Sequence, residues 1–392
     1  MFSSRVPAEL AANRLSAELH RLRAIGQPIV DLTVTNPATA GIAATPAELE
    51  ALVSEEACGY RPEPFGLMSA RDAIARRIAL RRGVMPPVDR IALTASTSEA
   101  YSVLFKLLCD AGDEVLVPQP GYPLFEHLAR LDLVNPIAYR LDDHDGWAID
   151  FDSLDRGWST RTRAVVVVSP GNPTGSWLRQ DDLRRLQARC TARSAALIVD
   201  EVFASYPIEP RADAVTAVLS VPDPPVLTFA LDGLSKSCGL PQLKLGWIEY
   251  AGPPGVVAAA RDRLELILDT YLSVGTPVQA ALPRLLMAGQ RLGDRIRDRV
   301  RRNLDSARRI VAGSPACDLL RVEAGWSAVI RVPAVVAEEA LVLRLLAEDG
   351  VLVHPGYFFD FPREAYVVVS LLPPPARFDE GLAHVIRRAG IA

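Results

Sequence analysis

Residues 164–203 read AVVVVSPGNPTGSWLRQDDLRRLQARCTARSAALIVDEVF, and this stretch decides the fold class. Its two apolar runs, Ala164–Ser169 and Ala196–Val202, lack polar alternation, which is typical of strands buried on both faces of a sheet. Between them, Asp181–Ala192 is predicted to form a helix. A strand, a helix and a second strand in this order indicate a crossover unit in a mostly parallel sheet.

The same alternation extends to both sides of this unit. A helix is expected over Ser98–Leu108, directly after one of the neighbouring strands. The further strands expected are Arg90–Thr94, Asp113–Val117, Val226–Ala230 and Lys244–Tyr250. Ligand sites in such sheets lie beyond the carboxyl ends of the strands, so the loops that follow them are where chemistry is expected.

The C-terminal third has a different pattern. A long helix is predicted over residues 292–311, with arginines on one face and an apolar stripe on the other, formed by Ile296, Val300, Leu304, Ala307 and Val311. A basic helix could contact nucleic acid, but a solvated helix face is the interpretation we favour. Short apolar runs follow at Ser327–Val332, Leu341–Leu346 and Tyr366–Leu371. They suggest a smaller α+β domain over residues 281–392, after an N-terminal arm (1–40) and a large domain (41–280).

Composition excludes several classes of protein. Apolar residues make up 49% and charged residues 23% of the 392, which excludes a disordered chain. The net charge of −4 is too balanced to indicate nucleic acid or an anionic membrane as partner. No uncharged apolar run reaches the ~18 residues of a membrane span, and the start MFSSRVPAELAANRL lacks a secretory signal. Five scattered cysteines without C-x-x-C and five unclustered histidines indicate reduced thiols in the cytoplasm and no metal site.

Four short segments follow or overlap the ends of the predicted strands. They are TASTSE (Thr94–Glu99), SPGNPTG (Ser169–Gly175), DEVF (Asp200–Phe203) and LSKSCGLPQLKLGW (Leu234–Trp247). Each alone is a weak signal, because an NPTG turn or a Ser-Lys pair is common on protein surfaces. In this order and at this spacing they form a strong signal.

With these segments, the chain resembles the aspartate-aminotransferase superfamily, the class I/II aminotransferases of fold type I, from Asn36-Pro37 to its last helix. The resemblance implies an α/β fold, with a large domain built on a mostly parallel, seven-stranded-type sheet and a smaller α+β C-terminal domain. It implies an enzyme that uses pyridoxal 5'-phosphate to move an amino group from a donor to a keto acceptor through a Schiff base on Lys236. A lyase, decarboxylase, β-replacement enzyme or oxidase using the same cofactor is the alternative.

The resemblance also assigns residues to the cofactor. Lys236 matches the lysine that binds it covalently, for which an amine with a disfavoured charged form is needed. Asp200 matches the aspartate that pairs with the pyridinium nitrogen, and a carboxylate after an apolar run is costly to bury without such a partner. Asn172 matches the contact to the ring oxygen, and Tyr122 the aromatic that stacks on the ring. The phosphate contacts implied are Ser96, Thr97, Ser235 and Lys244, joined by Tyr60 of the neighbouring subunit in a homodimer with shared active sites.

Three residues depart from the family pattern. Phe203 stands where a tyrosine usually donates to the ring oxygen, and Lys244 where an arginine usually binds the phosphate. Val368, within Tyr366–Leu372, stands where the family carries the arginine that binds the substrate carboxylate. Arg363 and Arg377 are nearest in sequence, and we expect neither to replace it.

The substrate pocket is therefore expected to be aromatic. Trp326 and Tyr357 match pocket positions of the family, and Phe358 is a further candidate. His354 is interpreted as a structural turn residue. We expect a bulky, partly apolar substrate whose carboxylate is absent, masked or bound elsewhere.

Overall fold

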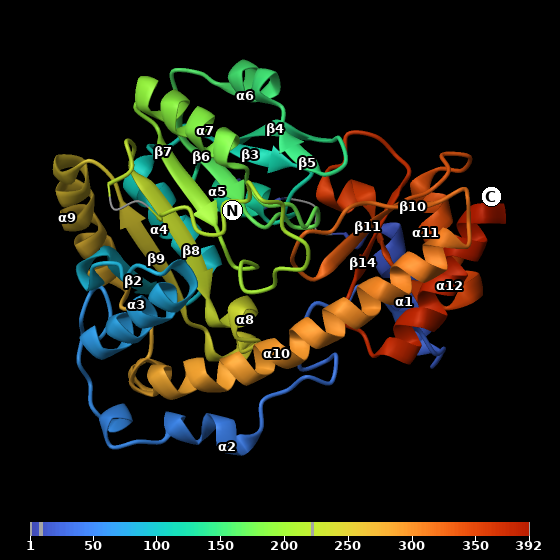
Figure 1. The fold of residues 1–392 in the computed structure, drawn as a ribbon, viewed down its shortest axis with the longest axis horizontal. Coiled ribbons are helices and arrows are strands. Elements are labelled where there is room, and N and C mark those ends of the chain that lie inside the picture. The colour runs from blue at the N-terminus through green and yellow to red at the C-terminus, as the bar shows by residue number, and fades with distance from the viewer. Residues whose placement is uncertain (1, 8–10, 221–222, 392) are drawn as a thin grey trace.

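The computed structural model describes residues 2–7, 11–220 and 223–391, which form two lobes joined by a long helix (Figure 1). The larger lobe contains an eight-stranded sheet in the order β2-β9-β8-β7-β6-β3-β4-β5. Its strands are β2 (Ile91–Thr94), β3 (Glu114–Gln119), β4 (Asn135–Asp143), β5 (Trp147–Ile149), β6 (Thr162–Val168), β7 (Ala196–Asp200), β8 (Thr228–Gly233) and β9 (Gly246–Ala251).

The predicted, mostly parallel sheet is confirmed. Strands β4, β3, β6, β7 and β8 run parallel, and β9 runs antiparallel to both β8 and β2. Two strands for which the sequence analysis made no prediction, β4 and β5, pair antiparallel with each other, and β5 forms one edge of the sheet. Both of these strands are only partly buried, so the continuous apolar runs that mark the central strands are missing there.

Helices cover both faces of the large sheet, which explains why its central strands lack polar alternation. One apolar layer includes side chains of α4 (Thr97–Leu108), α5 (Phe125–Leu131) and α9 (Pro254–Tyr271). The other includes side chains of α6 (Phe151–Gly157) and α7 (Gln180–Ala192). The remaining helices of this lobe are α2 (Pro46–Leu49), α3 (Met68–Arg82) and α8 (Leu234–Ser237), with short 3-10 turns at Glu50–Leu52, Glu56–Cys58, Val88–Arg90 and Pro241–Leu243.

The smaller lobe contains a four-stranded antiparallel sheet in the order β10-β11-β14-β13. Its strands are β10 (Asp318–Leu319), β11 (Ser327–Arg331), β13 (His354–Pro355) and β14 (Tyr366–Ser370), with a 3-10 turn at Gly356–Phe359. The N-terminal segment joins this lobe, because β1 (Val30–Asp31) pairs with β12 (Val351–Leu352). Three helices pack around it, namely α1 (Arg14–Ala24), α11 (Glu338–Asp349) and α12 (Pro375–Ile391).

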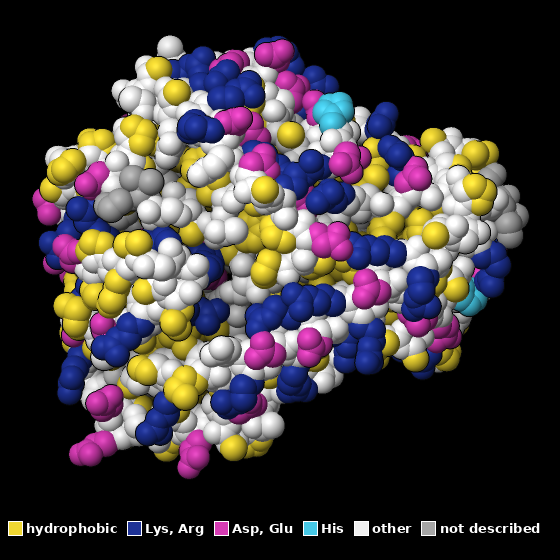
Figure 2. Space-filling model, viewed as in Figure 1, with side chains coloured by type: hydrophobic (Ala, Val, Ile, Leu, Met, Phe, Trp, Pro, Cys, Tyr) yellow, Lys and Arg dark blue, Asp and Glu magenta, His cyan; other side chains and the backbone are white. Residues whose placement is uncertain are grey.

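Helix α10 (Thr276–Ala312) runs along both lobes (Figure 1). Its predicted apolar stripe, from Ile296 to Val311, is buried. On the outer face, basic and acidic side chains alternate over this helix (Figure 2), as expected for a solvated face. The division of the chain at residue 280 stays a prediction, since α10 continues through it. No helix among the described residues is both long and apolar enough to span a membrane.

Candidate active site

A cavity of about 470 Å³ lies where the carboxyl ends of the central strands meet the smaller lobe. Asp200 ends β7, Val168 ends β6 and Gly233 ends β8, and all three line the cavity. The sheet topology predicted this location, because loops after parallel strands meet at one edge. Of the residues predicted to act, those in the cavity wall are Ser96, Thr97, Tyr122, Asn172, Asp200, Ser235, Lys236, Lys244 and Trp326.

Lys236 lies in α8, immediately after β8, and is partly buried. Its Nζ atom is 5.3 Å from the centre of the Trp326 ring. Burial lowers the pKa of the Lys236 amine below its ordinary value, although the charge of Asp200 works in the opposite direction. The Tyr206 hydroxyl donates to the Lys236 carbonyl oxygen at 2.6 Å and holds the backbone here. The structure thus presents an amine whose neutral, nucleophilic form is favoured.

Asp200 is a buried carboxylate without a cationic partner. Its Oδ2 atom accepts from the Tyr101 hydroxyl at 3.0 Å, and its Oδ1 atom accepts from the Val202 amide at 3.1 Å. Within the described residues, no Lys, Arg or His nitrogen lies within 4.0 Å of it. Burial raises the pKa of Asp200 to about 6. A ligand with a cationic N–H group would compensate this charge.

The start of α4, which lines the cavity, is suited to bind an anion. Ser96 is the N-cap of this helix, and its Oγ atom accepts from the Glu99 amide at 3.1 Å. Thr97 opens the helix, where unpaired amide groups and the helix dipole favour an anion. Gly246 of β9 packs directly on this turn, since a Cβ atom there would lie 3.1 Å from the Thr97 nitrogen. The hydroxyl of Ser235 and the cation of Lys244 come from the facing segment.

These features fit the cofactor that the sequence implies. An anion site, a buried carboxylate suited to a ring N–H, and a desolvated amine all face one cavity. Phe203, which departs from the family pattern, also lines the cavity and packs edge-on against Trp326, at 5.4 Å between ring centres. No group of His, Cys, Asp and Glu side chains suited to a metal ion occurs in the part of the chain that the structure describes.

Two predicted site residues lie outside the cavity. Tyr60 is 78% exposed and lines a separate shallow cleft with Ser273 and Gln279, so it does not reach the cavity of its own chain. Tyr357 is 40% exposed, and its ring packs edge-on against Phe358 at 5.1 Å. The structure puts Phe358 and Phe359, rather than Tyr357, in the cavity wall.

Sequence reasoning missed several residues of the cavity wall. Among them are Tyr101, which donates to Asp200, and Thr33 and Thr35, from the segment after β1. His354, which we interpreted as a structural turn residue, lines the cavity, whereas Arg363 and Arg377 do not. Arg363 instead lies 3.4 Å from the Tyr366 hydroxyl, and Arg377 pairs with Glu380. Among the described residues, no arginine lines the cavity.

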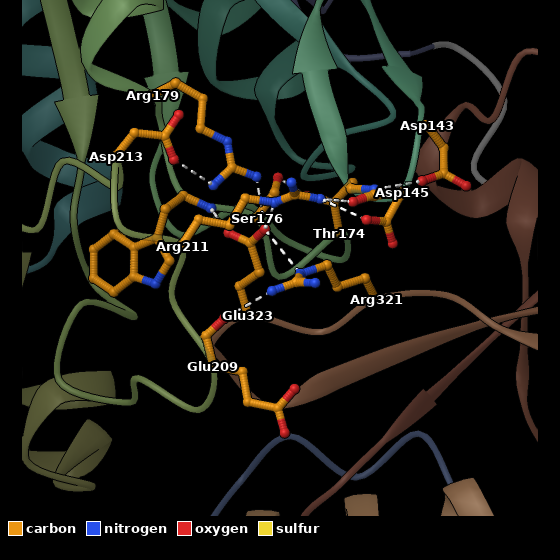
Figure 3. A network of polar contacts seen from close by, with 12 residues as sticks. Asp143, Asp145, Thr174, Ser176, Arg179, Glu209, Arg211, Asp213, Arg321 and Glu323 are labelled. Atoms are coloured by element: carbon orange, nitrogen blue, oxygen red, sulfur yellow. Dashed lines mark hydrogen bonds and ion pairs between the residues drawn. The ribbon is translucent and has the colours of Figure 1, made fainter.

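A buried ion network fixes the two lobes against each other beside the site (Figure 3). Its centre is Glu323, 1% exposed, whose Oε1 atom accepts from Arg179 Nη2 at 2.6 Å and Arg211 Nε at 3.3 Å. Arg321 Nε lies 3.3 Å from the same oxygen, and the Trp177 amide donates to Oε2 at 3.2 Å. The network therefore ties the chain after Asn172 to the chain before Trp326. A single glutamate between small and apolar residues carries no motif that would have revealed this role.

A glycine allows the same two segments to approach closely. Gly175 has a φ of +68°, and a Cβ atom there would lie 2.7 Å from the Ala324 carbonyl oxygen. Any other residue would strain the backbone and push the segments apart. The close approach at Gly175 and the ion network at Glu323 thus join the two segments that carry Asn172 and Trp326 into the cavity wall.

Known proteins share this architecture. Residues 27–380 match the model of the family described as aminotransferase class I and II. The chain is 28% identical to an alanine aminotransferase of Mycobacterium tuberculosis, over 100% of this chain and 90% of the relative. It is 25% identical to a glutamate-pyruvate aminotransferase of Haemophilus influenzae, over 94% and 93% of the two chains. The solved structure of an alanine aminotransferase from Pyrococcus furiosus matches with a TM-score of 0.88 at 23% identity, over 99% of each chain.

The family match covers most of the chain and includes every segment that forms the cavity. The fold, with its large mostly parallel sheet and smaller C-terminal lobe, is that of the fold type I enzymes in this family. The chain therefore belongs to the class I and II aminotransferases, pyridoxal-phosphate-dependent enzymes that move an amino group from an amino donor to a keto acceptor.

Proposed function

We propose that this aminotransferase holds pyridoxal 5'-phosphate with Lys236 Nζ as its covalent attachment point and Asp200 at its ring nitrogen. The observation that carries the proposal is the pairing of a desolvated amine and an uncompensated carboxylate in one cavity. Asn172 would contact the ring oxygen, and Tyr122 the ring face. The phosphate would lie at the start of α4, with contacts from Ser96, Thr97, Ser235 and Lys244.

When bound, the cofactor withdraws electrons from the substrate carbon that loses its proton. The Asp200 carboxylate would keep the ring nitrogen protonated, because the cation compensates a charge that is costly to bury. Lys236 Nζ would take the proton from the donor's Cα atom, since desolvation favours its neutral form. Trp326 lies beside this amine and limits the access of water to it.

We further propose a homodimer in which Tyr60 reaches the phosphate site of the partner subunit. Its support is the high exposure of Tyr60 and its distance from the cavity of its own chain. A location in the cytoplasm is proposed on the five cysteines, which form no disulfide with one another.

The proposed donor is a bulky, partly apolar amine without a free carboxylate next to the reacting carbon. Trp326, Phe358 and Val368 supply apolar walls, and no arginine among the described lining residues could pair with a carboxylate. In this respect the proposal departs from the relatives named for alanine and for glutamate with pyruvate.

The experiment is a panel of amino donors mixed with the cofactor-loaded enzyme, read by the change in the cofactor's absorbance without a keto acceptor. Large apolar amines and modified amino acids are expected to convert the cofactor, and aspartate, glutamate and alanine to do so at least ~10²-fold less efficiently. Efficient conversion by alanine or aspartate at low millimolar concentration would contradict the proposed pocket. Donor consumption without transfer of the amine would instead favour a lyase, decarboxylase or oxidase.

A further inference from the structure

The cavity has one end formed by the smaller lobe. The side chains that define this end are Trp326, Ser327, His354, Phe358, Val368 and Ser370. Among the described residues of this end, His354 alone carries an ionisable side chain, and the other polar groups are hydroxyls and an indole. Lys244 belongs to the end beside α4, and the Lys236 amine stands between the two ends, 5.3 Å from the centre of the Trp326 ring.

His354 stands directly opposite Val368. The two residues are paired across the antiparallel strands β13 and β14, and both line the cavity. Directly opposed residues of such a pair have Cβ atoms about 4.5–5.5 Å apart on the same face of the sheet. The imidazole therefore lies beside the isopropyl group that stands where the family has its arginine. The centre of the imidazole ring lies 5.8 Å from that of the Phe358 ring and 5.7 Å from that of the Phe359 ring.

The imidazole has hydrogen-bonding capacity that the protein does not use. Within the described part of the chain, neither ring nitrogen of His354 takes part in a hydrogen bond with another residue. Burial lowers the pKa of His354 below its ordinary value, although the charge of Asp31 works against this shift. At neutral pH the ring is therefore uncharged, with one nitrogen that donates and one that accepts.

We propose that His354 binds an uncharged polar group of the amino donor, such as a carboxamide or a hydroxyl, and that with Val368 it selects against a free carboxylate. This inference rests on the proposed function, because it assigns the substrate class of the same cavity. A carboxylate beside Val368 would lose its water against the aromatic rings and would gain no cation of its own, because the proposed function assigns Lys236 to the cofactor. A carboxamide would lose less on desolvation and can pair with one imidazole nitrogen, as donor or as acceptor.

The test measures binding of two unreactive ligands to the cofactor-loaded enzyme by calorimetry at pH 8. The ligands are 3-phenylpropanamide and 3-phenylpropanoate, which share shape and apolar area and differ in charge. The amide is expected to bind at least about 10-fold more tightly, since ~1.4 kcal/mol corresponds to a factor of ten. In His354→Leu the amide should bind about 5- to 30-fold more weakly. His354→Gln, which keeps a donor and an acceptor, should stay within about 3-fold of the unmodified enzyme.

Propylbenzene is the matched control, because it has no polar group for His354 to bind. Its affinity should change by less than about 2-fold in His354→Leu. An equal loss of affinity for all three ligands would show that His354 contributes only packing contacts, which would overturn the proposal. Equal binding of amide and acid by the unmodified enzyme would also overturn it. The cofactor's absorbance verifies that each variant is folded and loaded. A protein that binds no cofactor or transfers no amine would refute the proposed function itself, whereas a working transaminase that binds both ligands equally would refute the role of His354 alone.

Discussion

The end of the cavity beside α4 and the end formed by the smaller lobe differ in how their charges are balanced. Beside α4, the structure holds a buried carboxylate without an ion-pair partner, a desolvated amine and the start of a helix. At the other end, an aliphatic side chain and an imidazole stand among aromatic rings. The first arrangement is completed only by a charged ligand, and the second is suited to an uncharged one. Recognition of the cofactor and recognition of the substrate can therefore change independently within one cavity.

The largest expected effect comes from removing the amine that the first end is built around. Lys236→Ala should lower turnover by at least about 10⁴-fold, because it deletes both the attachment point and the proposed base. Borohydride reduction followed by mass spectrometry should find no covalent protein–cofactor adduct. Lys244→Ala is the matched control, a lysine of the same wall that should weaken cofactor binding and still yield the adduct. An adduct in Lys236→Ala would show that another lysine holds the cofactor.

Removing Glu323 tests whether its ion network holds the two lobes together as the structure shows. Glu323→Ala leaves Arg179, Arg211 and Arg321 without their shared buried carboxylate, so the free energy of unfolding should fall by about 3 kcal/mol. Chemical denaturation measures the change, and kcat should fall with it as Asn172 and Trp326 lose their spacing. Arg331, which pairs with Asp318 at the surface, supplies the control Arg331→Ala, expected to cost less than about 1 kcal/mol. Equal losses in the two variants would contradict a special role for Glu323.

The pKa of Asp200 predicts how the stability of the cofactor-free protein depends on pH. Its folded value of about 6 lies above the ordinary 3.8, so the folded chain keeps a proton that the unfolded chain has released. The contribution of this group is fully present below pH 3.8 and is lost as the pH rises through 6, by about 2–3 kcal/mol. The side chain of Asp200→Asn cannot lose a proton. The Tm of this variant minus that of the unmodified protein should therefore increase by about 2–3 °C from pH 4.5 to pH 7.5.

Thermal unfolding of both proteins without cofactor measures this difference. Adding pyridoxal phosphate should reverse it at pH 7.5, because only a carboxylate pairs with the protonated ring nitrogen. Parallel pH profiles of the two proteins would mean that Asp200 is already ionised in the cofactor-free state.

The smallest effect concerns Phe203, one of the three departures from the family pattern. Phe203→Tyr adds a hydroxyl that could donate to the ring oxygen, since Phe203 lines the cavity and the nearby Tyr206 hydroxyl is already bonded to the Lys236 carbonyl. One neutral hydrogen bond is worth about 0.5–1.5 kcal/mol, so the absorbance titration of the bound cofactor should move to lower pH by up to about one unit. An unchanged titration would show that residue 203 does not face the ring oxygen. Phe358→Tyr, at the opposite end, should leave the titration unchanged.

The sequence by itself determined the central sheet and the location of the chemistry. Unbroken apolar runs such as Ala164–Val168 are stable only between two layers of helices, and polar segments that follow parallel strands meet at one edge. Lys236, Asp200 and the start of α4 came together for this reason, since each lies within a few residues of a strand. The absence of an arginine at residue 368 could also be read without coordinates.

Only the tertiary structure decided which side chains complete the cavity. The 3-10 turn at Gly356–Phe359 directs Phe358 inward and leaves Tyr357 exposed, and no pattern of adjacent aromatics distinguishes these two outcomes. The position of His354 opposite Val368 depends on the register of two strands, where a shift of one residue would turn the imidazole to the other face. Glu323 meets Arg179 across 144 positions of sequence, and such a contact exists only once both lobes have folded. Local patterns determine the elements, whereas burial and register between distant segments determine which residues meet.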